Sequence, residues 1–282
     1  MIVDAHQHFW DPARADYPWM DAPELTPIRR AFGPADLAPL LKANGIDASI
    51  LVQCRSALAE TEEFLAIAHA TPSVIGVVGW ADLTDAALGE TLDRLRASPG
   101  GDKLVGIRHQ VHDEADPDWL LREDVQRGLT AVFAHDLAYD FLVRTRELPA
   151  AIATAQAFPQ ARFVLDHAAK PPIADGGSNE WSDRIAALAA CGNVWCKISG
   201  LATEAAWNDW DAQRLFPFVA HAAKCFGEDR LIFGSDWPVC LLAGSYGEIK
   251  SALEACLLKL GPQVREKAFG VNAKAAYRLA VG

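Results

Sequence analysis

Short apolar segments rich in β-branched residues recur along the chain and alternate with longer amphipathic segments. The short segments cover residues 2–6, 48–54, 74–80, 103–109, 138–143, 162–167, 194–199 and 230–236. Most are nearly continuous apolar runs rather than strict alternations of apolar and polar residues. Such runs are typical of parallel strands that are buried on both faces. We therefore predict eight parallel strands, of which the segment at 138–143 has the weakest pattern.

The intervening segments place apolar residues three or four positions apart, which predicts helices. These helices cover residues 33–45, 60–70, 87–97, 123–136, 148–158, 181–191 and 212–226, with further helices in 245–280 that close the far end. Glycine and asparagine favour helix C-caps, so helix ends are expected at Asn44–Gly45, Gly192–Asn193 and Phe226–Gly227.

Eight strands alternating with helices predict an α/β fold, a single-domain (β/α)8 TIM barrel over residues 1–282. A doubly wound open sheet is the alternative, because strand order cannot be read from one sequence. No glycine-rich phosphate loop follows any strand, which disfavours that alternative and predicts no nucleotide cofactor. The long loop at 9–32, rich in proline and with two tryptophans, is expected to lie over the barrel mouth.

Composition narrows the class of protein. A hydrophobic content of 51% and a charged content of 22% are those of a globular enzyme with a large core. The net charge of -11 argues against nucleic acid or an anionic membrane as a partner. The six cysteines include no C-x-x-C pair and lie in apolar segments, as expected for reduced thiols. With no signal-peptide pattern and no apolar run of ~20 residues, we expect a cytoplasmic protein.

The strands end on polar, often ionisable, residues. In a barrel of this kind the chemistry lies at the carboxyl ends of the strands. Those ends carry His6 and His8, Gln53, Trp80 and Asp82, Arg108 and His109, Tyr139 and Asp140, Asp166 and His167, Lys197 and Ser199, and Ser235 and Asp236. Three other histidines, His69, His135 and His221, fall on predicted helices. His112 falls in a loop and is expected to be solvated.

The first strand ends in a pair of histidines. Side chains two residues apart on a strand point to the same face, so the imidazoles of His6 and His8 converge. Such a pair is half of a divalent-metal site or an acid–base pair. A chance pair on a half-exposed strand end is the alternative, but histidines at two further strand ends, His109 and His167, favour a site.

The other strand-end residues divide by the chemistry they offer. Asp236 is a candidate general base, although an aspartate before Trp-Pro also starts turns. Neighbouring residues on a strand face opposite ways, so only one of Arg108 and His109 is expected to line the site. Lys197 either contacts the substrate or is a buried cation paired with a carboxylate. Ser199 and Ser235 lack a G-x-S-x-G context, which argues against a serine hydrolase.

Candidate substrate contacts are aromatic or polar side chains near the mouth. Sugar rings stack on flat apolar faces, which makes tryptophans near the strand ends candidates, although tryptophans are more often core residues. The candidates are Trp19, Trp80 and Trp237, together with the strand-end residues Gln53 and Tyr139.

The motifs DAHQHFWDP at 4–12, YPW at 17–19, RFVLDHAAKP at 162–171 and FGSDWPV at 233–239 together resemble the amidohydrolase superfamily. The resemblance runs from Ile2 to residue 272. It is closest to the branch of sugar lactonases that includes L-fuconolactonases and L-rhamnonolactonases. It implies that His6 and His8 match the metal pair of the first strand, His167 the histidine of the sixth and Asp236 the aspartate of the eighth.

One segment departs from the superfamily pattern. Metal-rich members carry a lysine or histidine at the end of the fifth strand, where this chain has Tyr139 and Asp140. We therefore expect no binuclear centre. The resemblance leaves two possibilities, a single divalent ion, with zinc preferred, held by His6, His8 and Asp236, or a metal-free site.

The resemblance implies a lactonase that opens an aldonolactone, such as L-fuconolactone or a stereochemical relative, to the aldonic acid. Asp236 would activate the water, and His167, His109, Arg108 or Lys197 would assist at the carbonyl. The expected partner is therefore a small-molecule sugar lactone. The alternatives are a metal-dependent decarboxylase of the same superfamily and a sugar-binding barrel without catalysis.

Overall fold

The eight apolar segments form eight parallel strands that pair in chain order. The computed structural model describes residues 1–279, so the last residues of the predicted 1–282 domain and of the 245–280 helical segment lie outside it. The strands are β1 (Val3–Gln7), β2 (Ala48–Val52), β3 (Val74–Gly79), β4 (Leu104–His109), β5 (Ala138–Phe141), β6 (Phe163–Leu165), β7 (Val194–Ile198) and β8 (Leu231–Phe233). The sequential order β1 to β8 confirms the barrel and excludes a doubly wound sheet.

Hydrogen bonds between β1 and the segment after β8 close the barrel. The backbone N–H of Asp236 donates to the carbonyl of His6 at 2.8 Å, and that of His8 donates to the carbonyl of Trp237 at 2.7 Å. The two strands that bear the predicted metal ligands are therefore neighbours.

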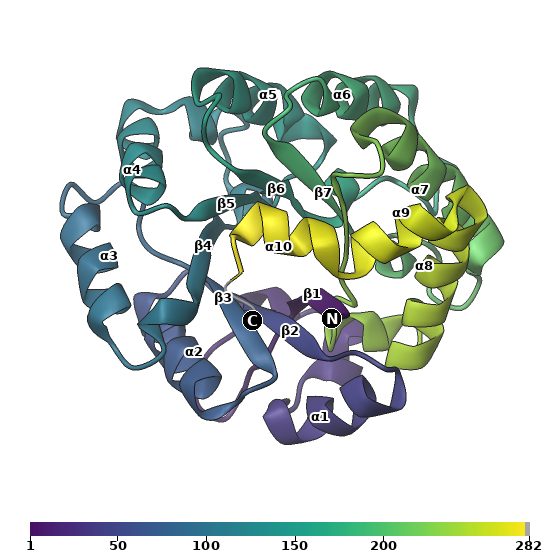
Figure 1. The fold of residues 1–282 in the computed structure, drawn as a ribbon, viewed down its shortest axis with the longest axis horizontal. Helices are drawn as coiled ribbons and strands as arrows, with labels where there is room; N and C mark the ends of the chain where they lie inside the picture. Colours follow the sequence, from purple (N-terminus) through teal and green to yellow (C-terminus); the bar gives the residue numbers. More distant parts are fainter. Residues whose placement is uncertain (280–282) are drawn as a thin grey trace.

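Helices surround the strands, as Figure 1 shows in a view along the barrel. They are α1 (Pro34–Ala43), α2 (Leu58–Ala70), α3 (Leu88–Ala97), α4 (Glu123–Ala134), α5 (Leu148–Ala157), α6 (Asn179–Ala189), α7 (Ala212–Phe226), α8 (Tyr246–Leu260), α9 (Pro262–Glu266) and α10 (Asn272–Tyr277). The helix ends at Asn44–Gly45 and Gly227 are as predicted. The end predicted at Gly192 is wrong, because α6 is capped by the right-handed Ala190 and needs no glycine there.

Two apolar cores stabilise the barrel. The larger lies between the strands and the surrounding helices. The smaller fills the inside of the barrel, where Val3, Ile50 and Val164 pack with Ala276 and Tyr277 of α10. Figure 1 shows α10 lying across the centre of the barrel, where it closes the amino-terminal end. The opposite end is left for the loops that follow the strands.

The loop at 9–32 folds back on itself beside the mouth. Its ends are joined by two backbone hydrogen bonds between Trp10 and Phe32, of 3.1 and 2.9 Å. Two short 3-10 helices, Pro18–Met20 and Pro23–Ile28, give the loop a defined path. As predicted, the loop is ordered over the mouth, and it places Trp19 and Leu25 on the cavity described below.

Candidate active site

The paired histidines lie at the carboxyl end of β1 and are both buried. Their Nε2 atoms are 3.1 Å apart. Nδ1 of His8 lies 2.7 Å from the carbonyl oxygen of Val52. Because a carbonyl only accepts hydrogen bonds, Nδ1 carries a proton, which leaves Nε2 as the nitrogen of His8 that can bind a metal ion.

Asp236 sits in the turn after β8 and faces this pair. Its Oδ1 is 3.3 Å from Nε2 of His8 and 3.7 Å from Nε2 of His6. The buried carboxylate of Asp4 fixes the turn, because it accepts hydrogen bonds from the backbone N–H (2.8 Å) and hydroxyl (2.6 Å) of Ser235. Asp236 itself has a left-handed backbone with φ 58°. A non-glycine residue in this region is a strained conformation that often marks a functional site.

His167 completes the cluster from the end of β6. Its Nε2 is 3.9 Å from Oδ1 of Asp236, and its Nδ1 is 2.9 Å from the hydroxyl of Ser199. Four consecutive residues, 167–170, are left-handed, with φ between 48° and 59°. Gly200 makes room for this turn, since a Cβ there would stand 2.5 Å from Nδ1 of His167. The folding of two separate loops therefore places this imidazole.

Charge and burial set the protonation of the cluster. Burial lowers the pKa of His167 to about 4 and the pKa of His6 well below its usual value, so both are neutral at neutral pH. Burial alone would raise the pKa of Asp236, but attraction to the imidazole of His167, which is protonated below a pH of about 4, and the contacts with His8 and His6 outweigh burial, so the pKa lies below its usual range. The cluster thus presents a carboxylate among neutral imidazoles.

Arg108 lies beside the cluster, and its guanidinium is held on two sides. It donates to Oδ2 of Asp166 at 2.9 Å and to the side-chain oxygen of Gln53 at 2.9 Å. It also lies 3.3 Å from Nε2 of His6. Of the two neighbours at the end of β4, Arg108 is therefore the one that faces the site. Gln53 fixes the position of the Arg108 guanidinium through this hydrogen bond.

A buried ion network supports the site from inside the barrel. The Nζ atom of Lys197 lies 2.7 Å from Oδ2 of Asp140 and 2.9 Å from Oδ1 of Asp166. Both carboxylates and the lysine are fully buried. Burial raises the pKa of Asp140 to about 6, although the ammonium of Lys197 opposes this shift. The hydroxyl of Tyr277, from α10, donates to Asp140 at 2.6 Å. Lys197 is thus placed as a charge-balancing cation within the barrel.

The donor atoms fit a single divalent ion. Nδ1 of His6 lies 3.3 Å from the carboxylate of Asp166, which accepts a proton, and 3.2 Å from the ammonium of Lys197, which donates one. Nε2 of His6 lies 3.3 Å from Arg108, which only donates, so this nitrogen is the one that offers a lone pair to the site. Lone pairs of His6, His8 and Asp236 then converge within 3.1 to 3.7 Å of one another, which is unfavourable without a cation. Carboxylates and peptide carbonyls that fix metal-binding imidazoles from behind are typical of metal sites.

A second ligand set overlaps the first. Single ligand atoms of His6, His167 and Asp236 lie within 4.8 Å of one another, and all three residues are buried. His167 therefore joins the residues predicted as ligands. The site is suited to a divalent metal ion.

A cavity of about 310 Å³ opens above the cluster. His8, Arg108, His167 and Asp236 line it from the barrel, and Trp19 of the 9–32 loop lines it from outside. Ligand pockets of this size suit small molecules.

Several cavity residues were not predicted as site residues. They come from loops after the strands and are His112, Arg144, Lys170, Glu204 and Trp207. The expectation that His112 is solvated was wrong, because its side chain is only 17% exposed and lies against the cavity. Of these residues, only Lys170 could have been found from the sequence, since it falls within the RFVLDHAAKP motif.

Two predicted residues lie together away from the cluster. His109 stacks on Trp119 with ring centroids 4.2 Å apart, and its Nε2 lies 2.7 Å from a carboxylate oxygen of Glu114. The indole N–H of Trp80 donates to Nδ1 of His109 at 3.0 Å. Their side chains point out of the barrel, as the alternation along a strand requires once Arg108 points in.

Two further predicted residues are packed in the outer core. Tyr139 is fully buried against Phe141 and Phe163, whereas its neighbour Asp140 points into the barrel. Trp237 is 1% exposed and packs against Phe9 and Phe32. Neither side chain lines the cavity over the cluster.

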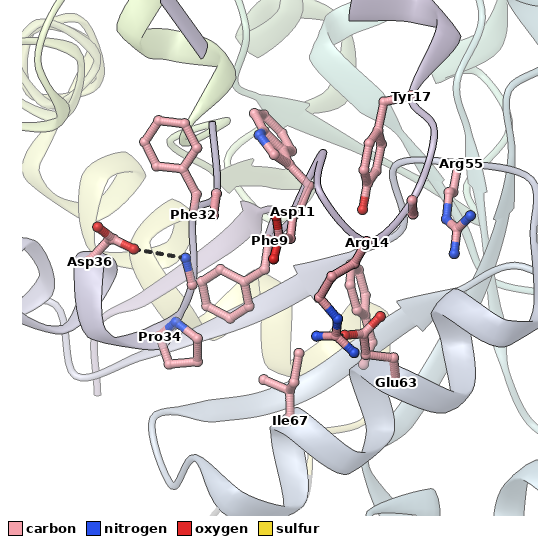
Figure 2. Close-up of a pocket in the computed structure, with 15 residues that line it drawn as sticks. Phe9, Asp11, Arg14, Tyr17, Phe32, Pro34, Asp36, Arg55, Glu63 and Ile67 are labelled. Carbon is pink, nitrogen blue, oxygen red and sulfur yellow. Dashed lines mark hydrogen bonds and ion pairs between the residues drawn. The ribbon is translucent and has the colours of Figure 1, made fainter. Parts of the chain in front are cut away.

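A second cavity, of about 370 Å³, lies on the outer side of the 9–32 loop. Figure 2 shows its apolar side chains, with Phe9, Phe32 and Ile67 among them, and the side chains of Arg14 and Glu63 close together. These two form an exposed ion pair of 2.8 Å. This cavity contains none of the predicted site residues, so we assign the chemistry to the cavity above Asp236.

Comparisons with known proteins agree with this constellation. The model of the amidohydrolase family matches residues 3–279. The chain belongs to the amidohydrolase family.

Relatives of this amidohydrolase match nearly the whole chain. An L-fucono-1,5-lactonase of Burkholderia ambifaria is 43% identical over 281 residues, which are 98% of this chain and 95% of the relative. An L-fucono-1,5-lactonase of Burkholderia multivorans is 38% identical over 98% of this chain and 96% of the relative. A crystal structure of a Burkholderia multivorans amidohydrolase with bound zinc has a TM-score of 0.93 and 38% identity, covering 99% of each chain.

Two further features of this amidohydrolase follow from the structure. All six cysteines are free thiols, and five of them are buried, as expected from their apolar surroundings. Among the described residues, no helix combines the length and the apolar character needed to cross a bilayer.

Proposed function

We propose that this amidohydrolase hydrolyses a sugar 1,5-lactone, with L-fucono-1,5-lactone or a close stereochemical relative as its substrate. The observation that carries the proposal is the carboxylate of Asp236 facing three buried imidazoles at the floor of a small-molecule cavity. The L-fucono-1,5-lactonases at 43% and 38% identity support the choice of substrate.

Hydrolysis of a lactone needs an activated water, a polarised carbonyl and a proton for the departing ring oxygen. Asp236 is a carboxylate at neutral pH and accepts a proton from water as the water adds to the lactone carbonyl carbon. When the bond from that carbon to the ring oxygen breaks, Asp236 returns the proton to the ring oxygen. The product is an open-chain hydroxy acid.

The carbonyl oxygen gains negative charge as water adds. Arg108 lines the cavity and is held rigidly by Gln53 and Asp166, so its charge needs little reorganisation to stabilise that oxygen. His167 faces the same space and can orient the attacking water. His109 has no part in this scheme, because its side chain lies outside the barrel.

We also propose that His6, His8 and Asp236 hold one zinc ion, with His167 beside them. A bound divalent ion would supply Lewis acidity to the lactone carbonyl. Metal analysis of enzyme purified without chelator should find about one equivalent of zinc, and His6→Ala should lower this content. His69→Ala, at an exposed position on α2, is the matched control and should keep the metal. Full activity of a protein stripped of all metal would assign the site to metal-free catalysis.

A panel of sugar 1,4- and 1,5-lactones tests the function. Acid release above spontaneous hydrolysis is expected for at least one 1,5-lactone, with L-fucono-1,5-lactone as the first candidate. Absence of turnover on every member, despite tight binding of one, would indicate a sugar-binding barrel. Release of carbon dioxide from an aromatic or unsaturated acid would indicate a decarboxylase instead.

We further propose that the enzyme acts in the cytoplasm. Its free thiols suit a reducing compartment.

A further inference from the structure

Three charged side chains line the cavity apart from the catalytic cluster and have no part in the chemical steps. Nζ of Lys170 lies 2.7 Å from Oε1 of Glu204, and a guanidinium nitrogen of Arg144 lies 3.5 Å from Oε2 of Glu204. All three residues line the same cavity as Asp236. They come from the loops after β5, β6 and β7, so only the folded barrel brings them together.

Glu204 is a carboxylate at neutral pH. Burial alone would raise the pKa of Glu204, but Lys170 and Arg144 outweigh burial and hold the pKa below its usual value. Its side chain is 14% exposed and that of Lys170 is 16% exposed, so the pair is largely shielded from solvent. Oε2 has only the long contact to Arg144, which leaves acceptor capacity on that oxygen.

The backbone places Lys170 beside the catalytic cluster. Lys170 is the last of the four left-handed residues that begin with His167, and its N–H donates to the carbonyl of His167 at 2.8 Å. The same turn therefore places His167 and Lys170 on the wall of one cavity. Strain of this kind persists where the surrounding structure enforces it for function.

An ion pair of this kind matches the hydroxyl groups of a sugar. A hydroxyl donates one hydrogen bond and accepts others, and the pair offers a carboxylate acceptor beside an ammonium donor. A lactone without hydroxyls also displaces water from the cavity, but it offers no hydrogen-bonding group to the carboxylate of Glu204 or to the ammonium of Lys170. The pair can thus favour polyhydroxylated substrates and disfavour apolar ones.

We propose that Glu204, held by Lys170, is the acceptor for the hydroxyl groups of the substrate and selects polyhydroxylated lactones over hydroxyl-free ones. This assignment rests on the proposed lactonase function. It names a specificity-determining residue and not a residue of the chemical steps. The alternative is an ion pair that only ties the three loops together.

The test compares two lactones on wild type and Glu204→Gln. L-fucono-1,5-lactone is the sugar substrate, and δ-hexalactone has the same methyl-substituted six-membered ring without hydroxyls. Loss of a charged hydrogen-bond partner should lower kcat/KM for the sugar lactone by about 10- to 100-fold. The value for δ-hexalactone should stay within about threefold, because that substrate has no hydroxyl to lose.

Glu254→Gln is the matched control. Glu254 also bridges two cations, Lys250 at 2.6 Å and Arg265 at 2.5 Å, but it lies on α8 and does not line the cavity. Its substitution should leave both kcat/KM values unchanged. Thermal melting of both variants reports on structural loss separately from selectivity.

Three outcomes would overturn the assignment. Equal loss of activity on both lactones, with a lowered Tm, would make the ion pair a structural tie. Unchanged kinetics of Glu204→Gln on the sugar lactone would remove it from substrate binding. A wild type that hydrolyses δ-hexalactone but no sugar lactone would refute the selection of hydroxyls and the proposed substrate class, whereas hydrolysis of neither would refute the proposed function itself.

Discussion

Replacing Lys197 by methionine tests whether this buried lysine balances charge or acts on the substrate. In the structure its ammonium lies 2.7 Å from Asp140 and 2.9 Å from Asp166, and all three groups are shielded from solvent. Methionine has a similar length and keeps the packing but removes the charge. Asp166 would retain Arg108 at 2.9 Å, whereas Asp140 would keep only the hydroxyl of Tyr277.

The expected cost is set by the carboxylate that is left without a cation. Removing one partner of a buried ion pair typically destabilises a protein by about 3–5 kcal/mol. The pKa of Asp140 is already raised to about 6 by burial, so in the variant it takes up a proton and the cost should lie near the lower limit. When the pKa of a carboxyl group is higher in the folded state, the free energy of unfolding of the protein decreases as the pH rises above the unfolded pKa of about 4. The deficit should therefore shrink as the pH is lowered toward 5.

Urea unfolding, followed by tryptophan fluorescence and circular dichroism, measures the effect. The double variant Lys197→Met with Asp140→Asn removes the uncompensated charge and should recover about 1–3 kcal/mol. Lys267→Met is the control, because Lys267 also contacts two carboxylates, Glu228 and Asp229, each at 2.6 Å, but on the surface. Its unfolding free energy should stay close to that of wild type.

The kinetic result decides between the two roles of Lys197. Charge balance predicts lowered stability, with kcat/KM affected only as far as His6 and Arg108 are displaced. A Lys197→Met enzyme as stable as wild type, with kcat/KM lost, would refute this reasoning and place the ammonium on the substrate.

Three further outcomes are expected. Asp236→Asn keeps the shape of the turn but removes the base, so kcat should fall by ~10²–10⁴-fold while circular dichroism shows the fold retained; near-normal turnover would make His167 the better candidate for the base. Burial lowers the pKa of His167 from 6.5 to about 4, so between these pH values the unfolded chain binds a proton at this histidine and the folded protein does not. In metal-free protein the free energy of unfolding should therefore fall by about 3 kcal/mol as the pH drops from 6.5 to 4. His167→Gln should flatten that part of the pH profile, and an equal slope in both proteins would contradict it. Trp19→Ala opens one wall of the cavity and should raise KM roughly two- to tenfold with little change in kcat, measured on the preferred lactone.

The sequence by itself determined the features that depend on local order. Continuous apolar runs alternating with helical periodicity specify the barrel, because buried strands and amphipathic helices have different repeats. The spacing of His6 and His8 places both imidazoles on one face whatever the rest of the chain does. The position of Asp236 directly after the last strand brings it to the same rim once the barrel closes.

Only the tertiary structure decided which neighbour on a strand faces inward. Arg108 and Asp140 point into the barrel, whereas His109 and Tyr139 point outward. Both faces of a barrel strand are buried, so the apolar runs carry no alternation that marks the inner face. For the same reason, the sequence could not decide whether Lys197 contacts the substrate or balances buried charge.

The cavity wall also came from tertiary structure alone. Arg144, Lys170 and Glu204 stand in three separate loops, and His112 in a fourth, with no shared spacing that relates them. Loops have no repeat from which a direction can be read, and their side chains meet only because the strands that carry them are neighbours in a closed barrel. Local sequence therefore specifies the strand ends and their chemistry, while closure of the barrel specifies which of those groups meet.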